Sequence, residues 1–443
     1  MTTSNGTQRS NGETSIVPAA VPGCVAVLSM HTSPLAPLGG RETGGMNVYV
    51  REVSAELARA GVAVDVFTRR ADAASAEAEV LSPGVRLIHV PAGPPKRIEK
   101  EEMIALTGAF AAGVRAFAAR DAGASGARYD VVHSHYWLSA VAGREVARAW
   151  ATPHVAMFHT LAEVKLLARA SEREPEARRA AERALVHDVD RIVAATEHER
   201  RLLEQVYSVP RQRVTVIPLG VHRERFRPRD QAAARAALGL DADARILLSV
   251  GRIEPLKGLD ILIESLGEMT ERARLLLLIV GGDDRAEHEL ARLRAVAAAS
   301  GVADLVRFVG AVPHEQLDAY YNAADVVVMP SFYESFGLVA VEAMASGVPV
   351  VASRVGGLTS TIADGRSGYL IPWRCPGPFA EKLDLLLGNE SLRRTLGATA
   401  AESMRVYEWG SVAARLLELY ATLPARGMAW AATEDLAPAA TGA

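Results

Sequence analysis

The sequence is poor in several kinds of residue, and each shortage excludes a class of protein. Its two cysteines, Cys24 and Cys375, cannot build a disulfide framework, so a reducing cytoplasm is expected. Lys plus Arg (49) and Asp plus Glu (52) nearly cancel, which argues against a nucleic-acid binder that relies on overall charge. No run of about 18 apolar residues occurs, so no membrane-spanning helix is expected. The polar start, 1–20, lacks the order of a signal peptide and is expected to be a disordered tail.

Lysine is scarce as well, because only five of the 49 basic residues are lysines. A GC-rich coding bias explains the excess of arginine without invoking function. It does not explain where the lysines stand, so their positions are informative. They are Lys96, Lys100, Lys165, Lys257 and Lys382.

Short apolar runs alternate with longer amphipathic segments along most of the chain. Strands are expected over 24–30, 62–69, 85–90, 129–137, 154–160, 191–197 and 214–220, and again over 245–252, 274–282, 306–312, 326–331 and 349–353. Helices are expected between most of them, notably over 45–60, 100–120 and 176–187. Buried runs separated by helices indicate parallel sheets covered on both faces. The sequence therefore predicts an α/β fold of two doubly wound, Rossmann-like domains.

Domain boundaries follow from the point where this pattern restarts. The polar segment 221–240, which contains Pro228, is expected to be a linker. We expect domains over 21–219 and 220–408, a helix over 409–425 that crosses back to the first domain, and a frayed end over 426–443. Ligands bind at the carboxyl ends of strands in such sheets, so an interdomain cleft is the expected site.

The most informative segment is SFYESFGLVAVEAMASGVPVVAS, at 331–353, with Glu334 and Glu342 eight residues apart. The turn 335–337 opens a predicted helix, and the free N–H groups of a helix start can bind an anion. A carboxylate such as Glu342 is suited to bind the vicinal hydroxyls of a ribose, and Glu334 can reach a second polyol. The alternative is a solvent-facing glutamate beside a carboxylate at a helix N-terminus.

Two further segments suggest ligand contacts. SVGRIEPLKG, at 249–258, places Arg252 and Lys257 after a strand, where two cations can bind a diphosphate and stabilise the charge that develops as it leaves. Two solvated surface cations are the alternative. The loop 31–47 contains four glycines that allow close approach to a ligand, although packing alone would also explain them. It is not G-x-G-x-x-G, so a dinucleotide site is not indicated.

The segment 331–353 resembles the E-x7-E signature of the retaining group 1 glycosyltransferases, also called family 4, and the resemblance extends over 24–422. It implies the GT-B fold, with a nucleotide-diphospho-sugar on the C-terminal domain and the acceptor on the N-terminal domain. The catalytic residues that it implies are His159, Arg252, Lys257 and Glu334, with no general base assigned. Implied donor contacts are Gly45, Arg252, Lys257, Val312, Glu334, Ser335, Phe336, Gly337, Leu338 and Glu342.

Five segments are similar to a narrower group, the D-inositol-3-phosphate glycosyltransferases of mycothiol synthesis. They are GGMNVYV (44–50), PAGPPKRIEKEEM (91–103), HSHYWLS (133–139), FHTLAEVK (158–165) and PEARR (175–179). The similarity implies transfer from UDP-N-acetylglucosamine to 1D-myo-inositol 3-phosphate. The acceptor phosphate would contact Lys100, Tyr136, Thr160 and Arg178, a set of cations and hydroxyls that suits it. The acceptor ring would contact His31, Glu42 and Asn47.

Other readings stay open. Glu42-Thr43 is similar to sucrose-phosphate synthases, which would transfer to fructose 6-phosphate. A lipid or polysaccharide glycosyltransferase, a nucleotide-sugar epimerase and a non-catalytic sensor are further alternatives. His133 and His135 are either core histidines or a metal pair, and without a third ligand we assign no structural zinc. No cofactor is assigned, although the resemblance allows Mg²⁺. We expect a cytoplasmic homodimer with no nucleic-acid partner and at most peripheral membrane contact.

Overall fold

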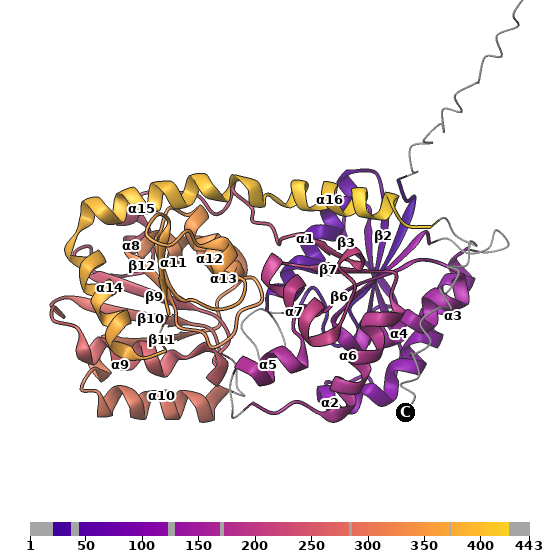
Figure 1. Ribbon diagram of the computed structural model, residues 1–443, viewed down its shortest axis with the longest axis horizontal. Coiled ribbons are helices and arrows are strands. Elements are labelled where there is room, and N and C mark those ends of the chain that lie inside the picture. Colours follow the sequence, from indigo (N-terminus) through magenta and orange to yellow (C-terminus); the bar gives the residue numbers. More distant parts are fainter. Residues whose placement is uncertain are drawn as a thin grey trace, which may run out of the picture.

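The chain forms two parallel sheets that lie side by side, each covered by helices (Figure 1). The computed structural model describes residues 21–36, 44–122, 129–168, 172–282, 286–372 and 374–424. The tails expected over 1–20 and 426–443 lie outside these residues. The predicted α/β fold with two doubly wound domains is confirmed.

The first sheet has eight strands in the order β3-β4-β2-β1-β5-β6-β7-β8. Its strands are β1 (Cys24–Leu28), β2 (Ala63–Arg69), β3 (Ala78–Ser82), β4 (Val85–Val90), β5 (Val131–His135), β6 (His154–Met157), β7 (Arg191–Ala194) and β8 (Val214–Val216). Its helices are α1 (Gly45–Arg59), α2 (Lys100–Met103), α3 (Thr107–Ala122), α4 (Tyr136–Trp150), α5 (Ala162–Ala168), α6 (Glu176–Asp188) and α7 (Glu197–Tyr207). Strands β2 to β4 lie on one side of β1 and strands β5 to β8 on the other, as in doubly wound folds.

The second sheet has six parallel strands in the order β11-β10-β9-β12-β13-β14. They are β9 (Arg245–Val250), β10 (Leu275–Val280), β11 (Val306–Gly310), β12 (Val326–Met329), β13 (Val350–Ser353) and β14 (Gly368–Ile371). The helices are α8 (Gln231–Ala237), α9 (Leu259–Glu268), α10 (Glu287–Ala299), α11 (Leu317–Ala323), α12 (Leu338–Ala345), α13 (Leu358–Thr361), α14 (Pro376–Gly388) and α15 (Glu390–Ser403).

Two local expectations were wrong, and one strand was not predicted. The strand expected over 129–137 ends at His135, because Tyr136 adopts φ +73° and starts helix α4. The expected linker 221–240 contains helix α8, which Asp230 caps by accepting a 2.7 Å hydrogen bond from the Ala233 N–H. Strand β3 pairs antiparallel with β4 at the sheet edge and was not expected, since it is largely exposed and so lacks a buried apolar run.

One stretch, Lys100–Asp121, is long and apolar enough to cross a membrane by length and composition alone. We expected none. Within this stretch Phe110 and Val114 are fully buried in the core of the first domain, where α3 packs against α4. Alanines such as Ala112 and Ala116 on the exposed face supply much of the remaining apolar character. By itself the stretch is weak evidence for a membrane span.

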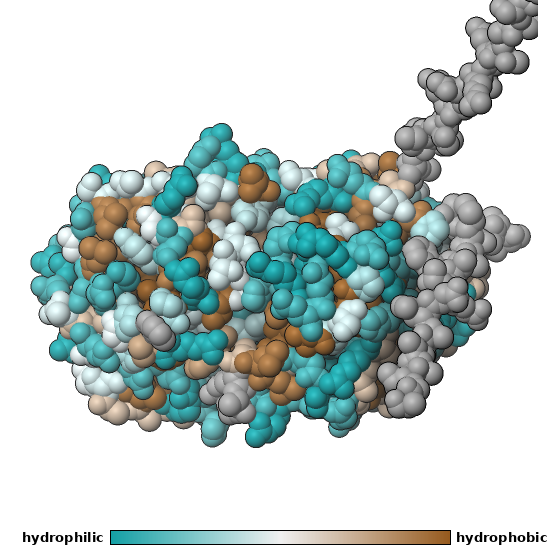
Figure 2. Space-filling view, in the orientation of Figure 1, coloured by the Kyte–Doolittle hydropathy of each residue, from teal (hydrophilic) through white to brown (hydrophobic). Residues whose placement is uncertain are grey.

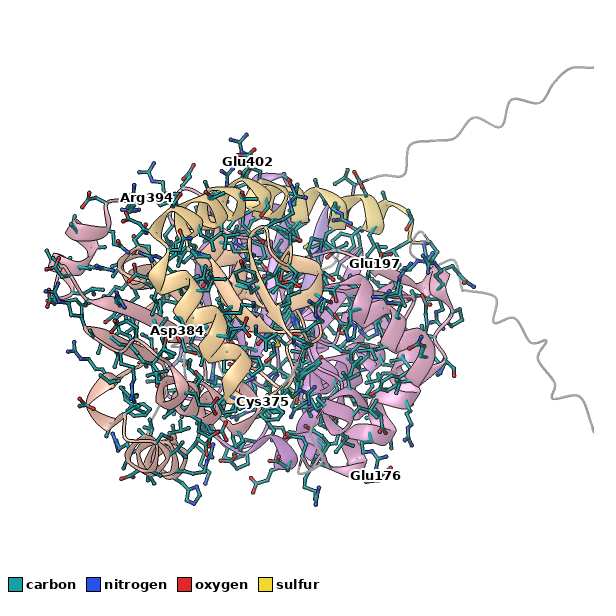
Figure 3. The ribbon with its side chains drawn as sticks, turned by 60° about the vertical axis from the view of Figure 1, so that its left-hand side comes forward. Glu176, Glu197, Cys375, Asp384, Arg394 and Glu402 are labelled. Atoms are coloured by element: carbon teal, nitrogen blue, oxygen red, sulfur yellow. The ribbon has the colours of Figure 1, made fainter. Side chains whose placement is uncertain are left out.

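The last described helix, α16 (Trp409–Ala421), runs from the second lobe across the first and packs against α1 (Figures 1 and 3). Its Trp409 is buried, with its ring centroid 5.9 Å from that of Tyr49 in an edge-to-face arrangement. A Cβ at Gly220 would lie 2.5 Å from the indole, so the chain between the domains passes directly over this ring. Hydrophilic and hydrophobic residues are interspersed on the face drawn in Figure 2.

We expect Trp409→Ala to lower the free energy of unfolding by about 3–5 kcal/mol, because it removes a large buried ring from the contact between α16 and α1. Urea denaturation followed by circular dichroism measures the change. Val406→Ala is the control, since that side chain is 69% exposed three residues earlier. An equal loss in both variants would contradict the packing role.

Candidate active site

A cavity of about 280 Å³ opens between the carboxyl ends of the two sheets. The site residues expected from the sequence line it, except Glu42, which lies outside the described residues. They are His31, Gly45, Asn47, Lys100, Tyr136, His159, Thr160, Arg178, Arg252, Lys257, Val312, Glu334, Ser335, Phe336, Gly337, Leu338 and Glu342. The structure therefore brings together residues spread over more than 300 positions of the chain.

The wall formed by the second domain depends on tightly packed turns. Gly337 precedes helix α12 with φ +91°, and a Cβ there would lie 2.5 Å from Leu358. The Gly357 N–H donates a 2.8 Å hydrogen bond to the Glu334 carbonyl and so supports the same turn. Because the first N–H groups of α12 have no helical partner and Ser335, Gly337 and Leu338 line the cavity, this wall suits an anion.

The charged side chains of this wall are paired with one another. Lys257 Nζ lies 2.7 Å from Glu334 Oε2, and Arg252 Nη2 lies 2.9 Å from Glu254 Oε1. Both Lys257 and Glu334 are mostly buried, so their mutual attraction is screened less than at an open surface. Sequence reasoning expected separate contacts for these two residues and did not expect the ion pair.

Glu342 is enclosed by partners that the sequence pattern did not reveal. Its Oε1 lies 2.6 Å from His314 Nε2, and its Oε2 accepts a 2.8 Å hydrogen bond from the Tyr321 hydroxyl. Burial and the Glu342 charge raise the pKa of Tyr321 well above its ordinary value, so this phenol remains a donor. The solvent-facing alternative for Glu342 is thereby excluded, since its side chain is only 3% exposed.

On the wall of the first domain, two residues have left-handed backbones although neither is glycine. Tyr136 follows β5 with φ +73°, and His159 follows β6 with φ +61°. Such conformations cost about 1–3 kcal/mol and tend to occur at functional sites. The Arg178 guanidinium lies 5.0 Å and the Lys100 ammonium 5.7 Å from the Tyr136 ring centroid. Helices α2 and α6, which carry Lys100 and Arg178, thus place two cations beside the Tyr136 phenol.

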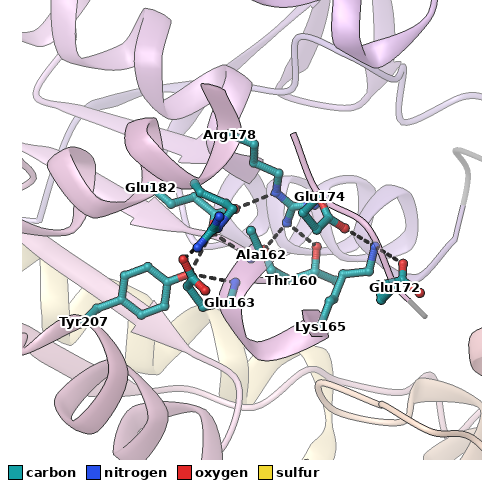
Figure 4. A network of polar contacts seen from close by, with 10 residues as sticks. Thr160, Ala162, Glu163, Lys165, Glu172, Glu174, Arg178, Glu182 and Tyr207 are labelled. Carbon is teal, nitrogen blue, oxygen red and sulfur yellow. Dashed lines mark hydrogen bonds and ion pairs between the residues drawn. The ribbon is translucent and has the colours of Figure 1, made fainter. Parts of the chain in front are cut away.

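Arg178 is held by the network drawn in Figure 4. Its Nε donates to Glu182 at 2.7 Å, its Nη1 to Glu174 at 2.8 Å, and its Nη2 to the Thr160 carbonyl at 2.9 Å and hydroxyl at 3.2 Å. Burial alone would lower its pKa, but Tyr136 and the two carboxylates raise it above the ordinary value. The guanidinium therefore stays charged and oriented, and it does not belong to a solvated helix face.

The other cation of this network is Lys165, which lies at the same cavity. Its Nζ is 3.1 Å from Glu172 and also contacts Glu174. Glu174 therefore bridges two cations, Lys165 and Arg178. Lys165 and Arg178 line the cavity, whereas the carboxylate that bridges them lies outside the lining residues.

Asn47 has its amide engaged within the protein. Its Oδ1 accepts a 3.0 Å hydrogen bond from the Gly44 N–H, and its Nδ2 donates to Thr32 Oγ1 at 2.8 Å and to the Ser33 carbonyl at 2.7 Å. These bonds join the two ends of the loop that enters helix α1. The geometry gives Asn47 a part in shaping this wall.

Burial lowers the pKa of two histidines that line the cavity, His159 and His31. Burial, with the His133 ring as a smaller cause, lowers the pKa of His159 to about 3. Burial, followed by Lys100, His159 and Arg178, lowers the pKa of His31 well below its ordinary range. Within the part of the chain that the structure describes, no group of three or more His, Cys, Asp or Glu side chains could hold a metal ion.

Comparisons with known proteins agree with this geometry. Residues 43–225 match the family described as "Glycosyltransferase Family 4", and residues 230–403 match "Glycosyl transferases group 1". The chain is 44% identical to a D-inositol 3-phosphate glycosyltransferase of Geodermatophilus obscurus, with 95% of this chain and 93% of that one covered. It is 41% identical to D-inositol 3-phosphate glycosyltransferase 2 of Catenulispora acidiphila, covering 90% and 95%.

Solved structures are similar over comparable lengths. Sucrose-phosphate synthase from Thermosynechococcus elongatus aligns with a TM-score of 0.83 and 34% identity, covering 90% of this chain and 98% of that one. Anabaena HepE in complex with UDP and glucose aligns with a TM-score of 0.72 over 90% of this chain and 100% of that one. At 18% identity, this second likeness supports the fold alone.

We expect Glu182→Gln to destabilise the protein by about 3–5 kcal/mol, because it leaves the buried Arg178 without one of its counterions. Glu182 is fully buried and also accepts hydrogen bonds from the Ala162 N–H at 2.7 Å and the Tyr207 hydroxyl at 2.9 Å. Thermal unfolding measures the effect. Glu176→Gln is the control, since its side chain is 69% exposed on the same helix, and the network has no such role if both variants unfold alike.

Proposed function

The chain belongs to the group 1, or family 4, glycosyltransferases, and from this premise we propose that it transfers N-acetylglucosamine from a UDP donor to 1D-myo-inositol 3-phosphate with retention of configuration. The observation that carries the proposal is a single cavity with the start of helix α12 on one wall and two cations around a phenol on the other. The similarity to the inositol-phosphate enzymes over nearly the whole chain supports the same acceptor.

We assign the donor to the wall of the second domain, over 220–408. Arg252, Lys257 and the start of α12 would bind the diphosphate, because they combine two cations with unpaired N–H groups. Glu342 would accept hydrogen bonds from the ribose hydroxyls, since His314 and Tyr321 hold its carboxylate in place. The Glu334 carboxylate would bind the donor sugar. Val312, Phe336 and Gly45 would shape the remaining contacts.

We assign the acceptor to the wall of the first domain, over 21–219. Lys100 and Arg178 would bind its phosphate, with hydrogen bonds from the Tyr136 and Thr160 hydroxyls. The Thr160 hydroxyl accepts from Arg178 and so keeps its own proton available for a phosphate oxygen. His31, Glu42 and Asn47 would face or shape the space for the inositol ring.

The proposed reaction exchanges one bond for another on the same face of the sugar. The bond from the anomeric carbon to the leaving diphosphate breaks, and a bond to the acceptor oxygen forms. The acceptor proton passes to the departing phosphate oxygen, so no protein base is required. Arg252 and Lys257 would stabilise the leaving group, and neutral His159 would orient the sugar or the attacking oxygen.

Lys257→Ala is expected to lower kcat by about 10²–10³, the loss typical of one group that stabilises a developing negative charge. Product formation by mass spectrometry at saturating donor measures it. Lys382→Ala is the matched control, because Lys382 lies on α14 outside the cavity. Near-wild-type turnover in Lys257→Ala would refute the role of Lys257 in stabilising the leaving diphosphate.

A matrix of donors and acceptors tests the substrate assignment. We expect the highest kcat/KM with UDP-N-acetylglucosamine and 1D-myo-inositol 3-phosphate, because the acceptor wall offers two cations to a phosphate. Better use of fructose 6-phosphate would favour the sucrose-phosphate synthase alternative, which the 34% identity to that enzyme supports. Preference for an acceptor without phosphate would remove the role given to Lys100 and Arg178.

The homodimer and the cytoplasmic location, which is expected from the two cysteines, stay predictions. Sedimentation velocity on the purified protein tests the first, and fractionation of the cells that make it tests the second. Mg²⁺ dependence is decided by repeating the substrate matrix with a chelator.

A further inference from the structure

His135 stands directly behind the two strained residues of the acceptor wall. It is the last residue of β5, it is buried, and it lies outside the residues that line the cavity. Its Nδ1 lies 3.0 Å from Nε2 of His159, which follows the neighbouring strand β6. His135 also immediately precedes Tyr136. One hydrogen bond therefore joins the left-handed turns that present Tyr136 and His159.

The chemistry of the pair makes this bond directional. Burial lowers the pKa of both imidazoles, so both are neutral near pH 7. A neutral imidazole carries a single N–H, and one ring must donate to the other. The tautomer of His135 therefore determines whether the other ring nitrogen of His159, Nδ1, is a donor or an acceptor.

Aromatic side chains pack around His135 and His159. The Tyr49 ring centroid is 5.5 Å from those of both His135 and His159, in edge-to-face arrangements. The His133 ring lies 4.4 Å from His135, and its Nδ1 lies 2.7 Å from the hydroxyl of Tyr420 on α16. Aromatic rings from α1 and β5 thus surround the hydrogen bond between His135 and His159.

We propose that His135 is a positioning residue of the transfer reaction, which holds His159 in one tautomer and fixes Tyr136 beside it through a single hydrogen bond between the ends of β5 and β6. This inference rests on the proposed function for the roles of His159 and Tyr136. His135 itself touches neither substrate. It acts on the reacting centre and the acceptor wall together, because its side chain bonds His159 and its backbone leads directly into Tyr136.

The test compares His135→Asn with His135→Gln. The asparagine amide can occupy the place of Nδ1, whereas glutamine carries its amide further out, toward the place of Nε2. We expect His135→Asn to keep turnover within about threefold of wild type. We expect His135→Gln to lower kcat about 10- to 100-fold and to raise the acceptor KM, as for the loss of groups that orient a reactant. Binding of UDP by calorimetry should be unchanged, because that site lies on the other domain.

His154→Asn is the matched control. His154 is a buried histidine on β6, and its Nε2 lies 2.8 Å from Ser134 Oγ on β5, across the same two strands but away from the cavity. We expect it to lower the melting temperature while leaving turnover and acceptor KM within about twofold. The contrast separates positioning from a general loss of strand packing.

The proposal is overturned if His135→Gln turns over like wild type, if both His135 variants lose activity equally, or if His154→Asn shows the same kinetic losses. A failure of the proposed function is visible separately, because wild type would then not transfer to inositol 3-phosphate. In that event the comparison is made with the acceptor that wild type does use. A selective loss in His135→Gln, with UDP binding intact, would still support the positioning role.

Discussion

A strand in a parallel sheet can reach its neighbour only through a crossover, so every strand of a doubly wound sheet ends at the same edge. The parallel strands of both sheets obey that constraint, while the edge strand β3 runs the other way, and their carboxyl edges face one cavity. The turns after the strands are consequently forced close together. Gly251 and Gly281 show how close: a Cβ at Gly281 would lie 1.9 Å from the Gly251 carbonyl oxygen.

The same crowding explains why the charges of the site are held by protein groups. Lys257 is paired with Glu334, Arg178 with Glu174 and Glu182, and Glu342 is held by His314 and Tyr321. A charge removed from water is strongly destabilising unless it is paired and hydrogen-bonded. Groups arranged in this way need little reorganisation when a ligand with complementary charge binds, which suits a site that must stabilise a leaving diphosphate.

Helix α16 connects this site to the far end of the chain. It leaves the second domain and packs on α1 through Trp409, while Tyr420 contacts His133 behind the acceptor wall. The segment between the domains passes over the Trp409 ring at Gly220. Relative movement of the domains would therefore act on the packing behind the acceptor wall, since Trp409 and Tyr420 of this one helix both contact residues there.

Much of the architecture followed from sequence pattern, because buried runs of four to eight residues separated by amphipathic segments have few alternatives to a doubly wound sheet. The turn before α12 was also foreseeable, since its glycine and its two glutamates lie within one short segment. Edge strand β3 and helix α8 were not predicted, because neither carries a buried apolar run. Helix α8 begins instead at Asp230, whose side chain caps it. An aspartate is equally typical of a loop, so the cap alone did not predict a helix.

The sequence by itself determined the two-domain α/β fold, the turn and helix start between Glu334 and Glu342, and the family. Tertiary structure alone decided which groups meet, such as His314 with Glu342 and His135 with His159, 28 and 24 positions apart. Periodicity reports how a segment is buried, whereas pairing depends on strand order and crossover geometry. The partners of a buried charge therefore leave no local signal, although burial makes such partners necessary.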